Sequence, residues 1–193
     1  MTNNKICLDF FNKIINNYVI HFSKISGGCI NECFKIESDQ KKYFIKINSS
    51  FNPFNEEKKG LKLLESTNTF TIPKVYEVGV EKKTAFLLME FIDGKIPSDD
   101  FWISFGYKLA KMHSHSNKFF GLDYNNYIGS LSQENTQHHD AIEFFINCRL
   151  LPQIRLISKS SNNQLFKRFD KLFSKLSEIL PNDKPALIHG DLW

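Results

Sequence analysis

The sequence is poor in the residues and runs that mark several classes of protein. Four cysteines in 193 residues are too few and too widely spaced for a disulfide framework, and no second Cys or His pair completes a zinc site around Cys29 and Cys33. No apolar run reaches the length of a membrane span, and the N-terminus lacks the pattern of a signal peptide. Lysines are scattered without a basic tract, and the net charge of +4 is small. We therefore expect a cytoplasmic protein with no structural metal site and with neither nucleic acid nor membrane as a partner.

Apolar residues, in contrast, are abundant. They make up 41% of the chain, with 19 Phe among them, and charged residues make up 24%. This composition is typical of a globular chain with large buried faces. The period of the apolar residues changes near residue 92. We therefore expect an α+β protein with two lobes, residues 1–92 and residues 93–193.

Residues 1–92 predict a small lobe that is mainly β. Apolar residues at steps of three and four predict an amphipathic helix over residues 5–17 and a short one over 56–66. Polar turns separate short apolar runs, which is typical of β-hairpins. The strands are expected at residues 18–25, 30–37, 43–47, 73–79 and 84–91, with a glycine turn at 26–28 and a polar turn at 38–42.

Residues 93–193 show helical periodicity instead. Asp93 and Gly94 are expected to form a linker, and residues 121–129 a loop. The helices are expected from an N-cap at Ser98, from Asp140 to a kink or end at Pro152, and over 165–180, before a final strand that begins at Ala186.

The first candidate functional feature is the glycine turn, Ser-Gly-Gly-Cys-Ile-Asn at residues 26–31. Gly27 and Gly28 have no Cβ, so the backbone N–H groups of such a turn can approach the phosphates of a nucleotide. The turn is neither a Walker A motif nor the full glycine loop of protein kinases. An ordinary hairpin turn remains the alternative.

The second feature is Lys46, near the end of the third expected strand. A Lys in this place matches the Lys that contacts nucleotide phosphates in kinases, where a Glu on the following helix holds it. Glu56 and Glu57 are both available, and we predict Glu57. In the alternative interpretation, Lys46 is a solvated strand residue and Glu57 is an acid favoured by the helix dipole.

The third feature is the apolar strand over residues 86–91, which leaves the small lobe. In bilobal kinases the backbone at this exit binds adenine. No side chain here is diagnostic, so this inference depends on the order of the features alone.

The fourth feature is the end of the sequence, where an apolar run leads into His189, Gly190 and Asp191. In kinase-like enzymes an Asp after such a run accepts the proton of the substrate hydroxyl during phosphoryl transfer. The alternative is a buried strand that ends at a polar turn. The weight of this interpretation comes from the four features together, because they occur in the order that a bilobal kinase requires.

The chain resembles the fructosamine kinase (ketosamine-3-kinase) family, whose relatives are the aminoglycoside and choline kinases. The blocks Asn-Tyr-Ile-Gly, Arg-Leu-x-Pro-Gln and His-Gly-Asp-Leu-Trp are specific to that family rather than to kinases at large. The stretches that carry the resemblance are residues 26–31, 43–48, 57–64, 87–90, 105–113, 120–122, 126–130, 144–153 and 187–193.

The resemblance implies a protein-kinase-like bilobal fold, with a complete β-rich small lobe and a partial helical large lobe. It implies ATP-dependent phosphorylation of a sugar hydroxyl on a small or protein-bound ketosamine, which leads to protein deglycation. Asp191 would be the catalytic base, Lys46 the phosphate contact and Glu57 its partner. Met89, Glu90 and Phe91 would line the adenine. The family has a Cys in the glycine turn, matched by Cys29, and we expect its oxidation to block nucleotide binding or to link two chains into a dimer.

The sequence departs from the family pattern in two places. Ala141 stands where the family usually has a Trp, and the Ser-Gly-Asn and second metal-binding Asp of the family would lie beyond Trp193. The ligands of the Mg²⁺ that accompanies ATP are therefore expected beyond Trp193. Two alternatives stay open: another small-molecule kinase of this fold, acting on an aminoglycoside, choline or homoserine, and an inactive truncated remnant without the magnesium ligands.

Overall fold

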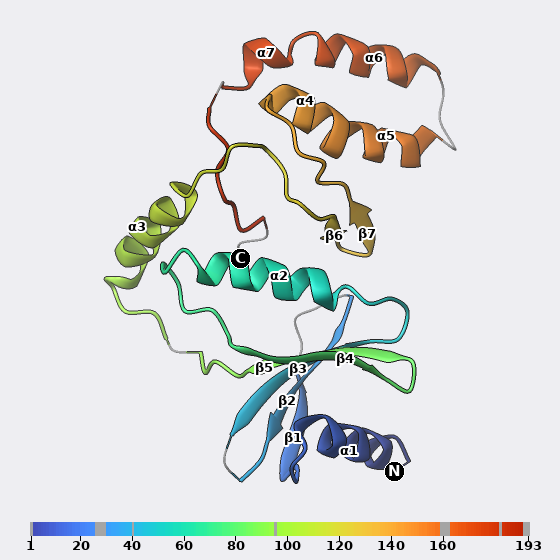
Figure 1. Cartoon of the computed structure of the whole chain (residues 1–193), viewed down its shortest axis with the longest axis vertical. Coiled ribbons are helices and arrows are strands. Elements are labelled where there is room, and N and C mark those ends of the chain that lie inside the picture. The colour runs from blue at the N-terminus through green and yellow to red at the C-terminus, as the bar shows by residue number, and fades with distance from the viewer. Residues whose placement is uncertain are drawn as a thin grey trace. The chain divides into compact units, whose positions relative to one another are not determined.

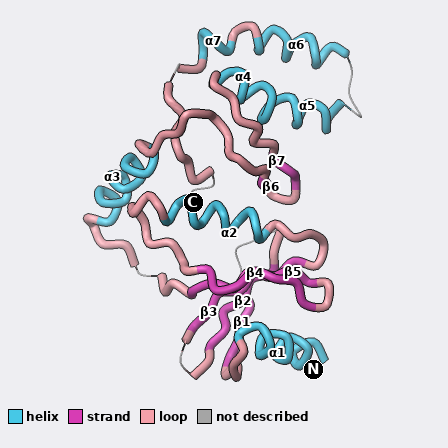
Figure 2. The backbone as a smooth tube through the Cα atoms, in the orientation of Figure 1, coloured by secondary structure: helices cyan, strands magenta, loops and turns pink. Residues whose placement is uncertain are grey.

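The computed structural model describes residues 2–25, 30–39, 41–94, 96–158, 163–181 and 183–190. The chain forms two compact units, residues 1–102 and 103–193. The first contains a five-stranded sheet with helices, and the second is mainly helical with a small hairpin (Figures 1 and 2). This confirms the predicted α+β class. The structure divides after Trp102. We predicted a lobe boundary after residue 92, and that boundary stays a prediction.

The sheet of the first unit is antiparallel throughout and has the order β1-β2-β3-β5-β4. All five predicted strands are confirmed, with somewhat different ends. Their bounds are His21–Ile25 for β1, Glu32–Glu37 for β2, Lys42–Asn48 for β3, Val75–Glu81 for β4 and Thr84–Glu90 for β5.

Two helices lie on opposite sides of this sheet (Figure 1). The predicted N-terminal helix is α1, Thr2–Ile15, and the predicted short helix is α2, Phe54–Glu65. On one face of the sheet, Phe11 of α1 packs in a core cluster with Ile45, and on the other face Phe54 of α2 packs in a second cluster with Leu87. Because side chains alternate along a strand, the central strands β3 and β5 contribute to both clusters.

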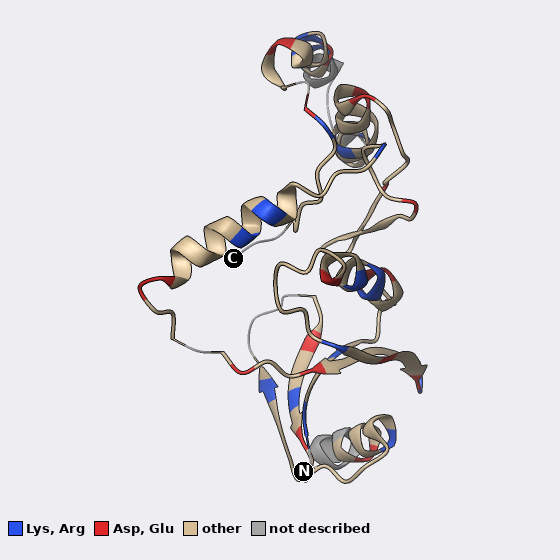
Figure 3. Ribbon diagram, turned by 60° about the vertical axis from the view of Figure 1, so that its left-hand side comes forward, with Lys and Arg blue, Asp and Glu red and all other residues tan. Residues whose placement is uncertain are grey.

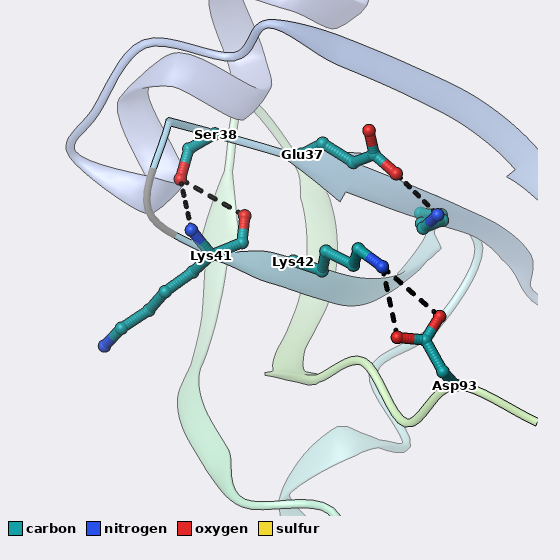
Figure 4. Close-up of polar contacts among 6 residues, drawn as sticks. Glu37, Ser38, Lys41, Lys42 and Asp93 are labelled. Atoms are coloured by element: carbon teal, nitrogen blue, oxygen red, sulfur yellow. Dashed lines mark hydrogen bonds and ion pairs between the residues drawn. The ribbon is translucent and has the colours of Figure 1, made fainter.

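Short polar turns join β2 to β3 and β4 to β5. In the β2–β3 turn the Ser38 N–H donates to the Lys41 carbonyl at 2.9 Å, and the Ser38 Oγ accepts from the Lys41 N–H at 3.2 Å (Figure 4). The predicted polar turn is therefore confirmed, except that Lys42 already belongs to β3. Between β4 and β5, Lys82 and Lys83 have φ values of 47° and 67°. Two positive φ values match the twist of a two-residue hairpin, although residues with a Cβ adopt them at a cost.

Helix α3 begins in the last two residues of the first unit and continues into the second. The bounds of the elements from here on are Phe101–His113 for α3, Asn126–Ile128 for β6, Leu131–Gln133 for β7, Ala141–Phe145 for α4, Ile146–Leu150 for the π-helix η1, Leu151–Ser158 for α5, Asn163–Phe173 for α6 and Leu176–Ile179 for α7. The prediction of a plain loop over residues 121–129 is wrong, because β6 pairs there with β7.

The two predicted helix starts have different outcomes. Asp140 is confirmed as the N-cap of α4, since its Oδ1 accepts from the N–H groups of Ile142 at 2.8 Å and Glu143 at 2.9 Å. Ser98 is not an N-cap. It lies in a turn ahead of α3, where its carbonyl accepts from the Phe101 N–H at 2.9 Å.

Pro152 does not end its helix, because the helical backbone continues through α5 to Ser158. The change of structure occurs before it, in the π-helix η1, where the Leu151 N–H donates to the Ile146 carbonyl. Pro152 has no N–H to offer the Cys148 carbonyl one turn earlier. The Arg149 guanidinium donates to that carbonyl instead, at 2.9 Å.

The helix predicted over residues 165–180 is interrupted, and α6 and α7 form in its place. At the break the Ser174 hydroxyl donates to the Lys171 carbonyl at 2.9 Å, and the Lys175 N–H donates to the Leu172 carbonyl at 2.9 Å. Both bonds are made with a residue only three positions back, which tightens the last turn of α6 and ends it.

Lys and Arg residues and Asp and Glu residues are distributed along the ribbon of each unit (Figure 3). On α2 the acids Glu56 and Glu57 occupy the first turn and Lys62 the last. The helix dipole stabilises charges placed in this way. Within the described ranges, no helix is both long and apolar enough to cross a membrane.

Candidate functional site

The first unit holds an ion pair on the face of the sheet that α2 covers. The Lys46 Nζ of β3 lies 2.6 Å from the Glu57 Oε1 of α2. Their side chains are only 27% and 26% exposed. An amine held in this way is a fixed positive charge with two further donor hydrogens. It can therefore contact an anionic group such as a phosphate.

The first turn of α2 explains why Glu57 rather than Glu56 makes this contact. Phe54 is fully buried against the sheet, and Leu61 packs on the same cluster. Residues at steps of three and four share one side of a helix, so Phe54, Glu57 and Leu61 form one stripe. Glu56 lies off this stripe. The ion pair that we predicted between Lys46 and Glu57 is present, and the role of the pair in phosphate binding stays a prediction.

A thiol lies beside the ion pair. Cys33 of β2 is directly opposite Lys46 in the antiparallel pair, so both side chains project from the same face. Cys33 is only 9% exposed. Burial raises the pKa of its thiol, while the Lys46 ammonium acts in the opposite direction and the Glu57 carboxylate in the same one. Since burial has the largest effect, the thiol stays protonated at neutral pH.

We expect Cys33 and Cys148, whose thiol pKa burial also raises, to react slowly with iodoacetamide in the folded chain. Because the reactive species is the thiolate, labelling in strong urea should be faster by about tenfold or more. Mass spectrometry of the labelled peptides over time measures both rates in one sample, and the urea sample is the control. Equal rates in the folded and unfolded chain would show that the two thiols are accessible.

Asn48 is a buried residue of this region that the sequence analysis did not single out. It is 8% exposed, and its Nδ2 donates to the Asn31 Oδ1 at 2.9 Å and to the Ile30 carbonyl at 3.3 Å. Its Oδ1 accepts from the Ser50 N–H at 2.8 Å. Asn48 thus connects the end of β3 with the residues that follow the glycine turn. Asn is rare in strands, so an Asn at the end of a predicted strand was the signal in the sequence that could have identified this residue.

The predicted glycine-turn residues Gly27, Gly28 and Cys29 lie outside the described residues, and so does Asp191. The prediction that Cys29 oxidation blocks nucleotide binding therefore stays a prediction. Among the described cysteines, Cys33 and Cys148 are free thiols.

The predicted adenine-lining residues lie at the end of β5. Met89 is buried in the cluster with Phe54, whereas Glu90 is exposed and its N–H donates to the Lys74 carbonyl at 2.8 Å. The Phe91 ring has the Lys35 Nζ 4.9 Å from its centroid. Adenine binding at this strand end stays a prediction.

Ion pairs hold the segment that follows β5. The Lys42 Nζ of β3 contacts both carboxylate oxygens of Asp93, at 3.1 and 3.4 Å (Figure 4). On β2, Lys35 pairs with Glu37, and this hydrogen bond holds the pKa of the Glu37 carboxyl below its usual range. Both pairs are partly exposed, so each contributes modestly to stability. The Lys42–Asp93 pair connects the strand exit to β3, whereas Lys35 and Glu37 both lie on β2.

In the second unit, the run before Asp191 is held by the segment after α3. The Leu187 N–H donates to the His115 carbonyl at 2.9 Å, and the Ser116 Oγ donates to the Pro185 carbonyl at 2.7 Å. The predicted final strand is wrong for the described residues, since Ala186 makes only an isolated bridge with Ser116.

The residues just before Asp191 are not buried either. Ile188 is 64% exposed. Gly190 has a φ of +89°, a conformation that side chains with a Cβ rarely adopt. A glycine is therefore required at the position that directly precedes Asp191.

In the described part of the chain, no three His, Cys, Asp or Glu side chains gather as they would around a metal ion.

Comparison with known proteins places the chain among kinases of one family. The sequence model of the fructosamine kinase family matches residues 9–193. A probable ketoamine kinase of Vibrio vulnificus is 35% identical over 176 residues, which is 88% of this chain and 60% of that protein. A chloroplastic protein-ribulosamine 3-kinase of rice, Oryza sativa, is 35% identical over 179 residues, which is 89% of this chain and 52% of that protein. The chain thus spans somewhat more than half the length of these curated relatives.

Solved structures agree with the sequence relatives. A Haemophilus somnus protein assigned as a fructosamine-3-kinase superposes with a TM-score of 0.79 at 26% identity, covering 97% of this chain and 65% of that one. An aminoglycoside phosphotransferase superposes with a TM-score of 0.65 at 13% identity, covering 96% of this chain and 64% of that one, which is a likeness of fold alone. The fold is therefore protein-kinase-like, as the resemblance implied.

Proposed function

The chain belongs to the fructosamine kinase family, and we propose on this basis that it binds ATP and transfers the γ-phosphoryl group to a sugar hydroxyl of a ketosamine. The observation that carries the proposal is the Lys46–Glu57 ion pair, 2.6 Å long and shielded from water, in a chain with this fold. Such a Lys contacts nucleotide phosphates in kinases of the protein-kinase fold. The ketoamine and ribulosamine kinases among its relatives indicate the class of acceptor.

The proposed steps assign a role to each predicted residue. The Lys46 ammonium contacts the ATP phosphates, and the Glu57 carboxylate keeps that ammonium in place. Asp191 accepts the proton of the sugar hydroxyl while the hydroxyl oxygen bonds to the γ-phosphorus and ADP leaves. Met89, Glu90 and Phe91 line the adenine. Magnesium supplies charge neutralisation between the phosphates in such reactions. No described group of side chains fits it, so we assign it no residue and no step.

The proposal is tested with the full chain and a panel of acceptors. ATP binding is measured by calorimetry, and ADP release is followed in the presence of fructosyl-lysine, ribulosyl-lysine, choline, homoserine and an aminoglycoside. We expect the chain to bind ATP, and we expect ADP release only when the acceptor is a ketosamine. Turnover of choline, homoserine or the aminoglycoside instead would favour another kinase of this fold. ATP binding without turnover of any acceptor would favour a non-catalytic nucleotide-binding chain.

Two further statements stay proposals beside this one. The acceptor is a small or protein-bound ketosamine, and phosphorylation of its sugar destabilises the adduct, which would serve protein deglycation. A cytoplasmic location stays a prediction from the sequence; the rice relative is named as chloroplastic.

A further inference from the structure

The last residue of β3, Asn48, is a buried amide whose four hydrogen-bonding positions are all used. Its two donor hydrogens go to the Asn31 Oδ1 and the Ile30 carbonyl. Its Oδ1 accepts from the N–H groups of Ser50 at 2.8 Å and Phe51 at 3.1 Å. A carboxamide has two donor hydrogens and two acceptor lone pairs. Turning it over would place N–H groups against N–H groups, so the surroundings select one orientation of the side chain.

On its donor side, Asn48 extends the pairing of β2 with β3. The backbone pairing of these strands ends at Glu32 and Ile47. The next opposed residues in this register are Asn31 and Asn48, and these two are joined side chain to side chain at 2.9 Å. The Cys33 thiol also donates weakly to the Asn31 carbonyl, at 3.9 Å. The segment that follows the predicted glycine turn is therefore fixed to the end of β3.

On its acceptor side, Asn48 holds the turn that leads into α2. The turn continues with the Asn52 Oδ1, which accepts from the Phe54 N–H at 3.2 Å. The Pro53 carbonyl then accepts from the Glu57 N–H at 3.1 Å. Bonds from Asn side chains to N–H groups a few residues ahead are a common way to fix a turn. A continuous series of short-range bonds thus connects Asn48 to the first turn of α2.

Asn48 also lies two residues from Lys46 on the same strand. Side chains at positions i and i+2 project from one face of a sheet, so both lie on the face that α2 covers. Lys46 precedes Asn48 in the chain, and Glu57 follows the turn that Asn48 holds. The orientation of this one amide therefore affects both members of the ion pair.

A buried Asn is a poor choice for the stability of a sheet. An apolar residue would fit a strand better, and a buried amide leaves polar groups unsatisfied as soon as one partner moves. Among the described residues, every buried side-chain nitrogen and oxygen has a partner. A fully satisfied polar network of this kind fixes one conformation. The amide at residue 48 thus contributes a defined geometry.

We infer that Asn48 is a positioning residue for phosphate binding, which holds Lys46, Glu57 and Asn31 in one arrangement before ATP arrives. The inference rests on the proposed function, in which Lys46 contacts the ATP phosphates. Asn48 does not contact the nucleotide itself, since its own chain occupies all its hydrogen-bonding positions. It raises the affinity because a site that is already ordered loses less conformational freedom when the ligand binds.

The test compares ATP with adenosine, which has the base and the ribose but no phosphate, in calorimetry with the full chain. We expect Asn48→Ala to weaken ATP binding by about fivefold to tenfold and to leave adenosine binding unchanged. The matched control is Asn12→Ala. Asn12 lies on α1, on the opposite side of the sheet, and its Oδ1 accepts from the Val19 N–H at 2.7 Å. This control removes a similar amide and should change neither ligand.

A double variant decides whether Asn48 acts through Lys46. Because Lys46→Ala already removes the phosphate contact, adding Asn48→Ala to it should change ATP affinity by less than about twofold. If the double variant instead loses the full additional factor, Asn48 acts independently of Lys46 and the inference is wrong. A merely structural role would weaken ATP and adenosine binding alike, which would also overturn it.

Asn31→Ala provides a second variant in case Asn48→Ala does not fold. It removes one acceptor of the Asn48 Nδ2 from a half-buried residue and leaves the turn before α2 in place. We expect ATP binding to weaken by about threefold, with adenosine binding and the hydrogen exchange of the Ser50 amide unchanged. ATP affinity equal to that of Asn12→Ala would refute the positioning role while the proposed function stands. A parent chain that binds no ATP would refute the proposed function, and the inference with it.

Discussion

Lys46→Ala will weaken ATP binding by about 10- to 100-fold, the equivalent of the 1.5–3 kcal/mol that a charged hydrogen bond contributes. The reason is geometric. The Glu57 carboxylate holds the Lys46 ammonium at 2.6 Å on the face of the sheet beside α2, so the charge is already in place when a phosphate arrives. The variant loses the charge itself. Calorimetric titration with a non-hydrolysable ATP analogue measures the change.

Two variants make this result specific. Glu57→Gln keeps the size of the side chain but releases the ammonium, so we expect a smaller loss, about fivefold to tenfold. Lys62→Ala removes an exposed lysine from the last turn of the same helix and should leave ATP binding unchanged. ATP affinity in Lys46→Ala that equals the Lys62→Ala value would refute the phosphate-binding role of Lys46.

Phe54→Ala will destabilise the first unit by about 3–5 kcal/mol, because it removes a fully buried ring and leaves a cavity between α2 and the sheet. Phe54 is the first residue of α2 and lies one turn before Glu57. Loss of its packing should therefore also move the carboxylate away from Lys46. Urea unfolding followed by circular dichroism measures the stability, and calorimetry of the folded fraction measures ATP binding.

Phe11→Ala is the matched control for this prediction. Phe11 is equally buried but belongs to the cluster on the opposite face, with Ile45. We expect a similar loss of stability with unchanged ATP affinity of the folded protein, since Lys46 and Glu57 lie on the other side of the sheet. If both variants weaken ATP binding alike, the effect comes from general destabilisation and not from the position of α2. Phe54→Leu, which leaves a smaller cavity, extends the comparison if Phe54→Ala does not fold.

The sheet and its ion pair were predictable because local patterns determine them. Short apolar runs between polar turns gave the strands, and the order of a strand Lys before a helix Glu gave the ion pair. The stripe of Phe54, Glu57 and Leu61 that favours Glu57 over Glu56 is a finding of the structure, because the helix was expected to begin only at Glu56. The β6–β7 hairpin was missed because each strand has only three residues, too few for an alternation to show.

Other features depend on contacts that a sequence pattern does not contain. The apolar period of Leu172, Leu176 and Ile179 continues across the break between α6 and α7, so the sequence showed one helix. The interruption comes from the Ser174 hydroxyl, which competes for a backbone carbonyl. The contacts of Arg149 were hidden for a related reason. Its guanidinium donates to the Glu134 carbonyl and to the Asn135 Oδ1, and both residues belong to a loop that precedes α4.

The strand order has a consequence for how the first unit folds. β1, β2 and β3 follow one another in the chain and pair locally, as do β4 and β5 across a two-residue turn. The junction between β3 and β5 instead joins Asn48 to Ala85, with α2 and β4 in the intervening loop. Closing so long a loop costs entropy before any contact repays it, which makes this junction the slow step. Lys46 lies on the β3 side of that junction, and Glu57 lies in the intervening loop, on α2. The ion pair is therefore completed only when the β1–β3 strands and the β4–β5 hairpin come together.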